Sequence, residues 1–311
     1  MALTKVDANE LNANVYNVVG PYRNRLINGG MRVAQRATSA TVTAGTGVPT
    51  ASTGYPSVDR WFVYSTGANV TAAQVAGTGA TQNRLQITGA ASVTAVGVGQ
   101  RIEQKNSYDL AGDNATLSVD LANSLLTTVT WTASYATTTA DTFGTIGTPT
   151  KTQIATGSFT VSSTLTRFTA SFAVPAAATT GIEILFTVGA QISGTWTVGN
   201  VQLEAGLVAS SFEQRNYGQE LALCQRYAFI LGSAVDIVGY NATGNNIGGT
   251  YCFPVTMRAA PTITGLAFSY SNANTGTMVA LSAQTAAFRA LVTATGAAQV
   301  SLISATITIE L

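Results

Sequence analysis

The feature that most constrains the fold of this chain is a two-residue alternation of apolar and polar side chains. The alternation recurs from Leu26 to Arg215, and Gly, Asn, Asp or Pro interrupts it at short intervals. The clearest examples are the segments 168–174 and 182–188. Because successive side chains of a strand point to opposite faces, this pattern predicts short strands with one buried face. We therefore expect an all-β protein built as a sandwich of two sheets.

The amino-acid composition suits short strands and tight turns. Charged residues make up only 9% of the chain, against roughly 25% in ordinary globular domains, and Thr, Ala, Gly, Ser and Val are abundant. A surface with so few charges has little electrostatic repulsion to oppose association. We therefore expect a homo-oligomer, with a trimer as the favoured form. The formal net charge of +1 leaves no global field to hold a polyanion, so we expect no nucleic-acid partner.

The length of 311 residues suits two domains that each bury a core. We place a jelly-roll-like β-sandwich at 23–218 and a smaller C-terminal β-sandwich at 219–311, after a helical or extended N-terminal anchor segment at 1–22. Within the anchor, Asp7 and Glu10 have the spacing of a capping box and predict a helix over 7–19. Because no stretch of the chain repeats at a fixed period, a β-solenoid is disfavoured.

Several segments carry more detailed predictions. The apolar run at 219–231 predicts either one or two helical turns or the first strand of the second domain. The regions around 40–54 and 136–150 are small, polar and rich in Gly, and we expect loops there. The end of the chain predicts a last strand with these side chains on one face: Ile303, Ala305, Ile307, Ile309 and Leu311.

Large aromatic side chains could either fill the sandwich core or stack on a sugar ring. Five of them lie within strand-like runs, where burial in the core is the more common role: Trp61, Tyr64, Trp131, Tyr135 and Trp196. Tyr55 and Tyr108 fall in expected loops and are no easier to assign. The sequence therefore predicts a well-filled core but leaves the ligand-binding residues unknown.

The chain contains no histidine, which excludes Ser-His-Asp triads, Cys-His dyads and His-based zinc sites. None of Lys5, Lys105 and Lys151 follows a glycine, so the chain has no phosphate-binding P-loop. Carboxylate-based glycoside hydrolysis remains open, because it needs only two acids across a cleft. The sequence gives no pairing among the acids of the first domain, which are Asp59, Glu103, Asp109, Asp113, Asp120, Asp141, Glu183 and Glu204.

The simpler interpretation is that these acids have structural roles. Asp59 is next to Arg60 and Glu103 is close to Arg101, so these residues can form ion pairs or lie in turns. We therefore expect no enzyme activity and name no catalytic residue. Asp109 and Asp113 lack the dense spacing of a calcium loop, so we expect neither a metal nor a cofactor.

The two cysteines, Cys224 and Cys252, are too few for a disulfide scaffold and too far apart for a metal knuckle, so we expect two buried, reduced thiols. The start of the chain lacks the basic-then-apolar pattern of an export signal, and Asp236 interrupts the most hydrophobic later run. We expect a protein made in a cytoplasm, without membrane insertion.

Several blocks of the sequence, in order, resemble a domain of the tail-fibre and virion appendage proteins of tailed bacteriophages. They are RNRLINGGMRVAQRAT (23–38), YPSVDRWFVY (55–64), RIEQKNSYDLAGDNATLSVDLANS (101–124), WTVGNVQLEAGLVASSFEQRNYGQELALCQRY (196–227) and MRAAPTIT (257–264). The resemblance implies a jelly-roll-like sandwich similar to carbohydrate-binding modules and a place on a virion. It carries over no catalytic residues.

Three functions are therefore expected in this order. The first is a tail fibre or short appendage that docks on other virion proteins through its N-terminal segment and presents β-domains to host-surface polysaccharide. The second is a head fibre or capsid decoration protein with a structural role only. The third, a lesser alternative, is a carboxylate glycosidase.

Overall fold

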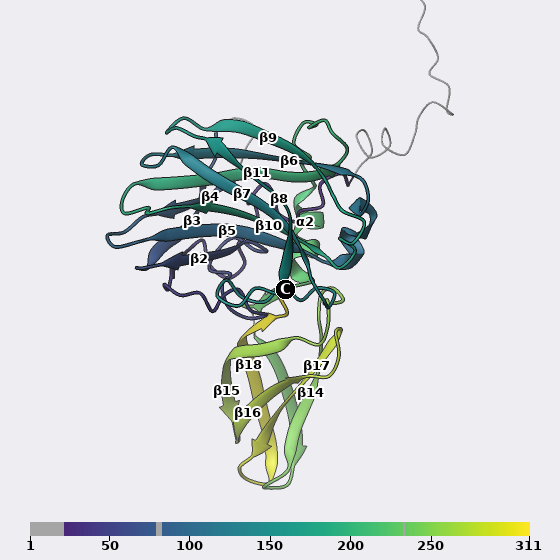
Figure 1. Ribbon diagram of the computed structural model, residues 1–311. Helices are drawn as coiled ribbons and strands as arrows, with labels where there is room; N and C mark the ends of the chain where they lie inside the picture. Colours follow the sequence, from purple (N-terminus) through teal and green to yellow (C-terminus); the bar gives the residue numbers. More distant parts are fainter. Residues whose placement is uncertain (1–21, 79–82, 233) are drawn as a thin grey trace, which may run out of the picture. The chain divides into compact units, whose positions relative to one another are not determined.

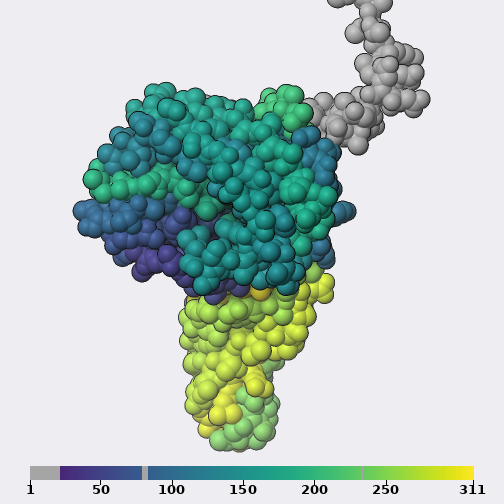
Figure 2. Space-filling model, viewed as in Figure 1, coloured from purple at the N-terminus to yellow at the C-terminus, as the bar shows by residue number. Residues whose placement is uncertain are grey.

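The computed structural model describes residues 22–78, 83–232 and 234–311 (Figure 1). The helix expected at 7–19 and nearly all of the anchor segment 1–22 lie outside these residues. Backbone contacts divide the chain into two compact units, of which the first ends at Asn216 and also includes Leu311, and the second is Tyr217–Glu310. Atoms of the second unit run from green to yellow in Figure 2.

The first unit contains two antiparallel sheets that form a β-sandwich. The six-stranded sheet has the order β1-β3-β4-β11-β6-β9. Its strands are β1 (Ser39–Val42), β3 (Val70–Ala76), β4 (Asn83–Thr88), β11 (Thr195–Ala205), β6 (Asn114–Asn123) and β9 (Thr166–Ala173). The loop expected around 40–54 is wrong at its start, because residues 39–42 pair as an edge strand with β3.

The second sheet of the sandwich has five strands in the order β2-β5-β10-β7-β8. They are β2 (Phe62–Thr66), β5 (Ala95–Ile102), β10 (Ile182–Val188), β7 (Thr128–Ala136) and β8 (Lys151–Thr160). Two short 3-10 helices, η1 (Gln104–Asn106) and η2 (Tyr108–Leu110), join β5 to β6. The strand expected at 182–188 is confirmed as β10, and the alternation expected at 168–174 is confirmed in β9.

One hydrophobic core fills the space between these two sheets. Trp61, Trp131 and Trp196 are all buried in it, which confirms that the tryptophans serve the core. The rings of Trp131 and Phe172 stack at 5.5 Å between centroids. Burial of one large apolar side chain stabilises a fold by about 1.5–3 kcal/mol, so these rings contribute strongly to sandwich stability.

Two aromatic side chains of β2 do not belong to that core. Strand alternation directs Val63 inward, whereas Phe62 and Tyr64 lie on the outer face of the five-stranded sheet, where they pack with Tyr55. Their rings lie over Gly97 and Gly99 of β5, where an added Cβ would come within 2.0 Å of Tyr64 and 2.4 Å of Phe62. The expectation that Tyr64 fills the space between the sheets is therefore wrong: its ring is buried by the loop that covers this outer face.

The second unit begins with a helix and continues as a smaller sandwich. The apolar run 219–231 proves to contain both expected alternatives, because α2 (Tyr217–Gln225) is followed by β12 (Ala228–Leu231). In one sheet β18 pairs with β12, β13 and β15, and in the other the order is β14-β17-β16. The remaining strands are β13 (Val235–Asn241), β14 (Asn246–Cys252), β15 (Thr262–Ser271), β16 (Ala273–Ala280), β17 (Thr285–Val292) and β18 (Gly296–Thr308).

The single shared face expected for the last strand is wrong at Ile303 and at Leu311. Ile303 is 44% exposed whereas Leu302 is fully buried. Phe268 pairs with Leu302 and Ala267 pairs with Ser304, so Ile303 is an extra residue in β18 that shifts the alternation, as a β-bulge does. Leu311 lies beyond the end of β18 and belongs to the first unit.

Both cysteines are free thiols, but only Cys224 is buried. Cys252 is exposed, because alternation in β14 turns its side chain away from the core that Tyr251 and Phe253 contact. The expectation of two buried thiols is therefore wrong for Cys252. Within the part of the chain that the structure describes, no helix is long and apolar enough to cross a membrane.

Candidate functional site

Glu183 of β10 is the most deeply placed acid on the outer face of the five-stranded sheet. Arg101 Nε donates a hydrogen bond to Glu183 Oε2 at 2.8 Å, and Lys151 Nζ contacts Glu183 Oε1. Burial, and secondarily the negative charge of Glu183, raises the pKa of Tyr64. Because Arg101 and Lys151 contact both carboxylate oxygens, the negative charge of Glu183 is balanced within the fold. This supports a structural role for Glu183.

Asp120 of β6 has a similar arrangement on the outer face of the six-stranded sheet. Its Oδ1 pairs with Arg167 Nη1 at 3.1 Å, and its Oδ2 accepts a hydrogen bond from Asn200 Nδ2 at 2.7 Å. Arg167 Nη2 also donates to Ser118 Oγ. These contacts tie β9, β6 and β11 together across the sheet.

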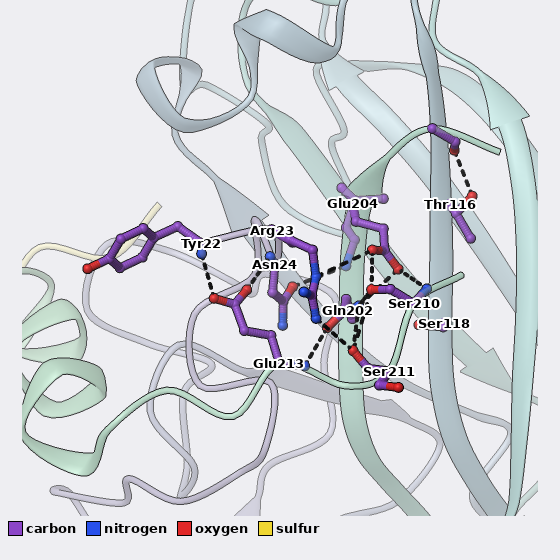
Figure 3. Close-up of polar contacts among 12 residues, drawn as sticks. Tyr22, Arg23, Asn24, Thr116, Ser118, Gln202, Glu204, Ser210, Ser211 and Glu213 are labelled. Carbon is purple, nitrogen blue, oxygen red and sulfur yellow. Dashed lines mark hydrogen bonds and ion pairs between the residues drawn. The ribbon is translucent and has the colours of Figure 1, made fainter. Parts of the chain in front are cut away.

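Glu204 of β11 is buried in a polar cluster of the first unit (Figure 3). Its Oε1 accepts hydrogen bonds from the main-chain N–H of Ser210 at 2.9 Å and from Gln202 Nε2 at 2.9 Å. Ser210 Oγ donates to Oε2 at 2.5 Å. Because a buried carboxylate is costly without such donors, this set stabilises the segment that leaves β11.

Figure 3 also shows how the segment that enters the sandwich is fastened to the segment that leaves it. The main-chain N–H groups of Tyr22 and Asn24 donate to the two carboxylate oxygens of Glu213, at 2.6 and 2.7 Å. Arg215 in turn donates to the carbonyl oxygen of Leu26 at 2.9 Å. We call the contacts of 22–26 with 211–215 the clasp, because they join residues about 190 positions apart in the sequence.

The remaining acids also have structural neighbours. Asp59 accepts a hydrogen bond from the main-chain N–H of Gln35 and lies 3.7 Å from Arg36, while Asp109 pairs with Arg25 at 2.6 Å. Asp113 and Asp141 accept hydrogen bonds from the main-chain N–H groups of the residues Asn114 and Gln104, respectively. Glu103 is buried and precedes η1.

Arg101 reaches across strands to pair with Glu183 of β10. Glu103, at the N-cap position of η1, is a turn residue, which is one of the two structural roles expected for it. Among the residues that the structure describes, no three acids or cysteines gather closely enough to hold a metal ion.

An open and uncommitted surface does occur on the outer face of the six-stranded sheet. Thr41 of β1 pairs with Thr71 of β3, Thr71 pairs with Thr88 of β4, and Thr88 pairs with Thr195 of β11. Their sequence neighbours, such as Val42, Ile87 and Trp196, point into the core, so these four side chains point outward. We call them the threonine row, in which hydroxyl groups recur about 4.8 Å apart, the spacing of neighbouring strands.

The hydroxyl groups of the threonine row make no hydrogen bond to any residue within the described ranges, and three of the four side chains are exposed. Other threonines of the same unit behave differently. Thr66 pairs with Thr94 at 2.8 Å, and Thr132 pairs with Thr156 at 3.2 Å. The row is therefore a line of free donors and acceptors, since each hydroxyl can do both.

A shallow depression of about 130 Å³ lies at the row. It is lined by Thr41, Asn69, Val70, Thr71, Thr88, Gly89 and Ala90. Gly89 is required by close packing, because a Cβ there would lie 2.3 Å from the carbonyl oxygen of Gln191. This contact, with the hydrogen bond from Gly89 N–H to the carbonyl oxygen of Gly194, fixes the turn after β4 beside the row.

The chemistry of this site is neutral hydrogen bonding, since its lining residues carry no titratable side chain. Hydroxyl groups of this kind can donate to and accept from the hydroxyl groups of a neutral ligand. Sequence reasoning missed the row because it joins four strands that are far apart along the chain. The available signal was a threonine at an outward position in each strand, which is common in strands and says nothing about register.

Comparison with known proteins gives partial structural likenesses. No protein-family model matches the chain, and no curated protein matches it. A similar solved structure is the enzymatically active domain of tailspike protein 4 of bacteriophage CBA120, with 18% identity over 52% of this chain and 21% of that chain, at a TM-score of 0.35. This chain thus covers about a fifth of that domain.

Two further similar structures are carbohydrate-binding modules. One is a family 61 module in complex with β-1,4-galactotriose, with 12% identity, 59% of this chain and 99% of that chain covered, and a TM-score of 0.36. The other is the family 11 module of Clostridium thermocellum, with 16% identity, coverage of 56% and 99%, and a TM-score of 0.33. The sandwich assignment rests on the strand pairing of this chain itself, described above.

Proposed function

We propose that this chain is a structural protein of a tailed-bacteriophage virion, a tail fibre or short appendage, and that it attaches to neutral host-surface polysaccharide through the threonine row. The observation that carries the attachment proposal is the set of four outward hydroxyl groups without a hydrogen-bond partner in the described structure. Polysaccharides present hydroxyl groups at regular intervals along an extended chain, and a straight row of protein hydroxyls can satisfy several of them together.

Tight attachment through such a site requires several copies of it to bind the same polysaccharide. One hydrogen bond contributes only about 0.5–1.5 kcal/mol net, so four shallow contacts give weak binding at a single site. When one particle carries several copies of the chain, the first copy to bind holds the others close to the same polysaccharide. The later binding events then occur at a high effective concentration, and avidity exceeds the single-site affinity by a factor on the order of 100 or more. The homo-oligomer that we propose, with a trimer as its favoured form, provides this multiplicity.

The virion location is supported by the sequence blocks that resemble phage appendage proteins, which fall on structurally defined parts of the chain. The block 23–38 contacts the block 196–227 at two places: in β11, where Arg25 N–H donates to the carbonyl oxygen of Leu203, and in the clasp, where Asn24 N–H donates to Glu213. In this proposal the protein is assembled in the bacterial host cytoplasm, and its N-terminal segment binds other virion proteins.

We propose binding without catalysis. Glu183, Asp120 and Glu204 are each held by cations or hydrogen-bond donors, which supports structural roles for these acids. A glycosidase would release reducing ends from a polysaccharide that the protein binds. A colorimetric reducing-end assay on bound polysaccharide checks this directly, and a time-dependent release of ends would contradict the proposal.

The location is tested by labelled antibodies on intact virions in electron microscopy. Labels confined to the tail support a fibre or appendage. Labels spread over the head identify the alternative, a head fibre or capsid decoration protein.

The attachment is tested on an array of bacterial surface polysaccharides, where we expect retention on neutral chains and no dependence on ionic strength, because no charge takes part. Binding that disappears with added salt would contradict a neutral hydroxyl site.

A further inference from the structure

The strands of the second unit are almost free of charge. Residues 228–308 contain only three charged side chains, Asp236, Arg258 and Arg289. Soluble domains normally keep roughly 25–35% charged residues on their surface, which limits association. Arg258 lies in the segment before β15, so the two sheets carry one charge each, Asp236 on β13 and Arg289 on β17.

The outer face of the sheet that contains β13 and β18 carries a single charge and two large exposed apolar side chains. Asp236, Val238 and Tyr240 alternate outward along β13, and Val238 and Tyr240 are 71% and 77% exposed. Opposite them, in register, β18 presents Ser301, Gln299 and Ala297. We call this surface the acidic face; its two large exposed side chains, Val238 and Tyr240, lie beside Gln299 and Ala297.

The outer face of the β14-β17-β16 sheet has the same character with the opposite charge. Arg289 of β17 is exposed and lies in register between Gly248 of β14 and Thr277 of β16. The next outward position on β16 is Val279, which is 59% exposed. We call this the basic face. Small partners around Arg289 leave its guanidinium accessible.

We propose that the second unit associates with second copies of this chain by packing the acidic face of one copy on the basic face of the next, so that Asp236 meets Arg289 of the neighbour. Neither side chain forms an ion pair or hydrogen bond within the described structure. They lie on the outer faces of two different sheets, so one copy cannot pair them with each other. Charge complementarity thus selects a neighbouring copy as the occupant.

The contact joins two different surfaces and is therefore heterologous, so repetition closes into a ring when the rotation between copies allows. In a closed ring, the acidic face and the basic face of every copy are both covered. The exposed side chains of Val238, Tyr240 and Val279 are then buried in the contacts. This inference deepens the oligomer part of the proposed function, and it does not depend on the polysaccharide site.

Charge reversal tests the contact on the full-length protein. We expect the wild type to form a discrete oligomer in sedimentation equilibrium. Asp236→Arg places two cations together and Arg289→Asp places two anions together, so each reversal weakens association by about tenfold or more. The double variant Asp236→Arg/Arg289→Asp restores the opposite charges and is expected to recover the wild-type mass.

A matched control adds a charge away from both faces. Ala294→Arg lies in the exposed turn before β18, and we expect it to keep the wild-type mass. Circular dichroism melts establish that every variant is folded. A wild type that remains monomeric at all concentrations overturns the proposal, as does an oligomer that both single reversals leave intact or that the double variant fails to restore.

The polysaccharide array separates this outcome from the proposed function. Reversal variants that dissociate yet still bind polysaccharide, with reduced avidity, support the face-to-face contact and the attachment site separately. A wild-type oligomer without polysaccharide binding contradicts the attachment site and leaves the contact standing.

Discussion

Arg101 Nε donates a 2.8 Å hydrogen bond to Glu183 Oε2, and both side chains are buried although they lie on the outer face of the five-stranded sheet. The two residues are directly opposite each other in the pairing of β5 with β10. Arg101 also lies against the rings of Phe62 and Phe143, at 5.5 and 5.2 Å. Loops that cover this face thus enclose a charged pair together with aromatic rings.

Replacement of the acid in this pair is expected to be strongly destabilising. Glu183→Gln leaves Arg101 and Lys151 without their shared counter-charge in a buried setting, and loss of one partner from a buried pair costs about 3–5 kcal/mol. Urea unfolding gives the free-energy change. The control Asp109→Asn removes an exposed partner from Arg25 and is expected to cost at most about 1 kcal/mol. Equal losses in the two variants would contradict this account.

The pH dependence of stability follows from Tyr64, whose pKa is raised above its ordinary value of 10.0 by burial and, secondarily, by Glu183. The unfolded chain releases this proton near pH 10 while the folded chain retains it. The stabilising contribution is therefore complete below about pH 10 and is lost as the pH rises through the folded pKa. Between pH 9 and 11, the unfolding free energy of the wild type should fall more steeply than that of Tyr64→Phe. Parallel curves would contradict the assignment.

Close ring packing makes Gly97 intolerant of a side chain. Gly97→Ala places a Cβ within 2.0 Å of the Tyr64 ring, which must move from its site, and overpacking of this kind costs about 1–3 kcal/mol. Gly45→Ala is the matched control, because an added Cβ there meets no atom within 4 Å. Thermal melts of both variants check the difference, and an unchanged melting temperature for Gly97→Ala would show that the ring is not held over β5.

The clasp is expected to hold the incoming segment through Glu213. Glu213→Gln replaces one accepting oxygen by a donor, so the main-chain N–H of either Tyr22 or Asn24 loses its partner. A hydrogen bond to a charged group is worth about 1.5–3 kcal/mol, and exchange of these two amides should accelerate accordingly. Hydrogen–deuterium exchange measures this, with the amides of β10 as an internal standard. Unchanged exchange at 22–24 would mean that other contacts hold the segment.

Strand positions were predictable where alternation was long and uninterrupted. The strand at 182–188 needs no other information, because its two faces differ clearly in polarity. The last strand was less predictable, since the bulge at Ile303 arises from pairing with β15 and leaves no local signal. Tyr64 was misplaced for a related reason: alternation identifies two faces, but it does not reveal that a loop covers the outer one.

The buried ion pairs and the candidate site both depend almost wholly on strand pairing, which alternation does not reveal. Glu183 and Arg101 are 82 positions apart, and only the pairing of β5 with β10 brings them together. The threonine row likewise requires the register of four strands, and a shift of one residue in any of them would turn its threonine into the core. Composition predicted an uncharged surface, but it could not predict which hydroxyl groups lack a partner.

The most direct test of the account compares polysaccharide binding by Thr71→Val/Thr88→Val with binding by Thr132→Val/Thr156→Val. Valine keeps the shape and strand preference of threonine and removes only the hydroxyl groups. The first variant loses two members of the threonine row, and the second loses a hydroxyl pair on the other sheet that already bond to each other. On the polysaccharide that the wild type binds best, surface plasmon resonance should show binding reduced about tenfold or more for the first variant and unchanged for the second. Equal binding by both variants would contradict the assignment of the threonine row as the attachment site.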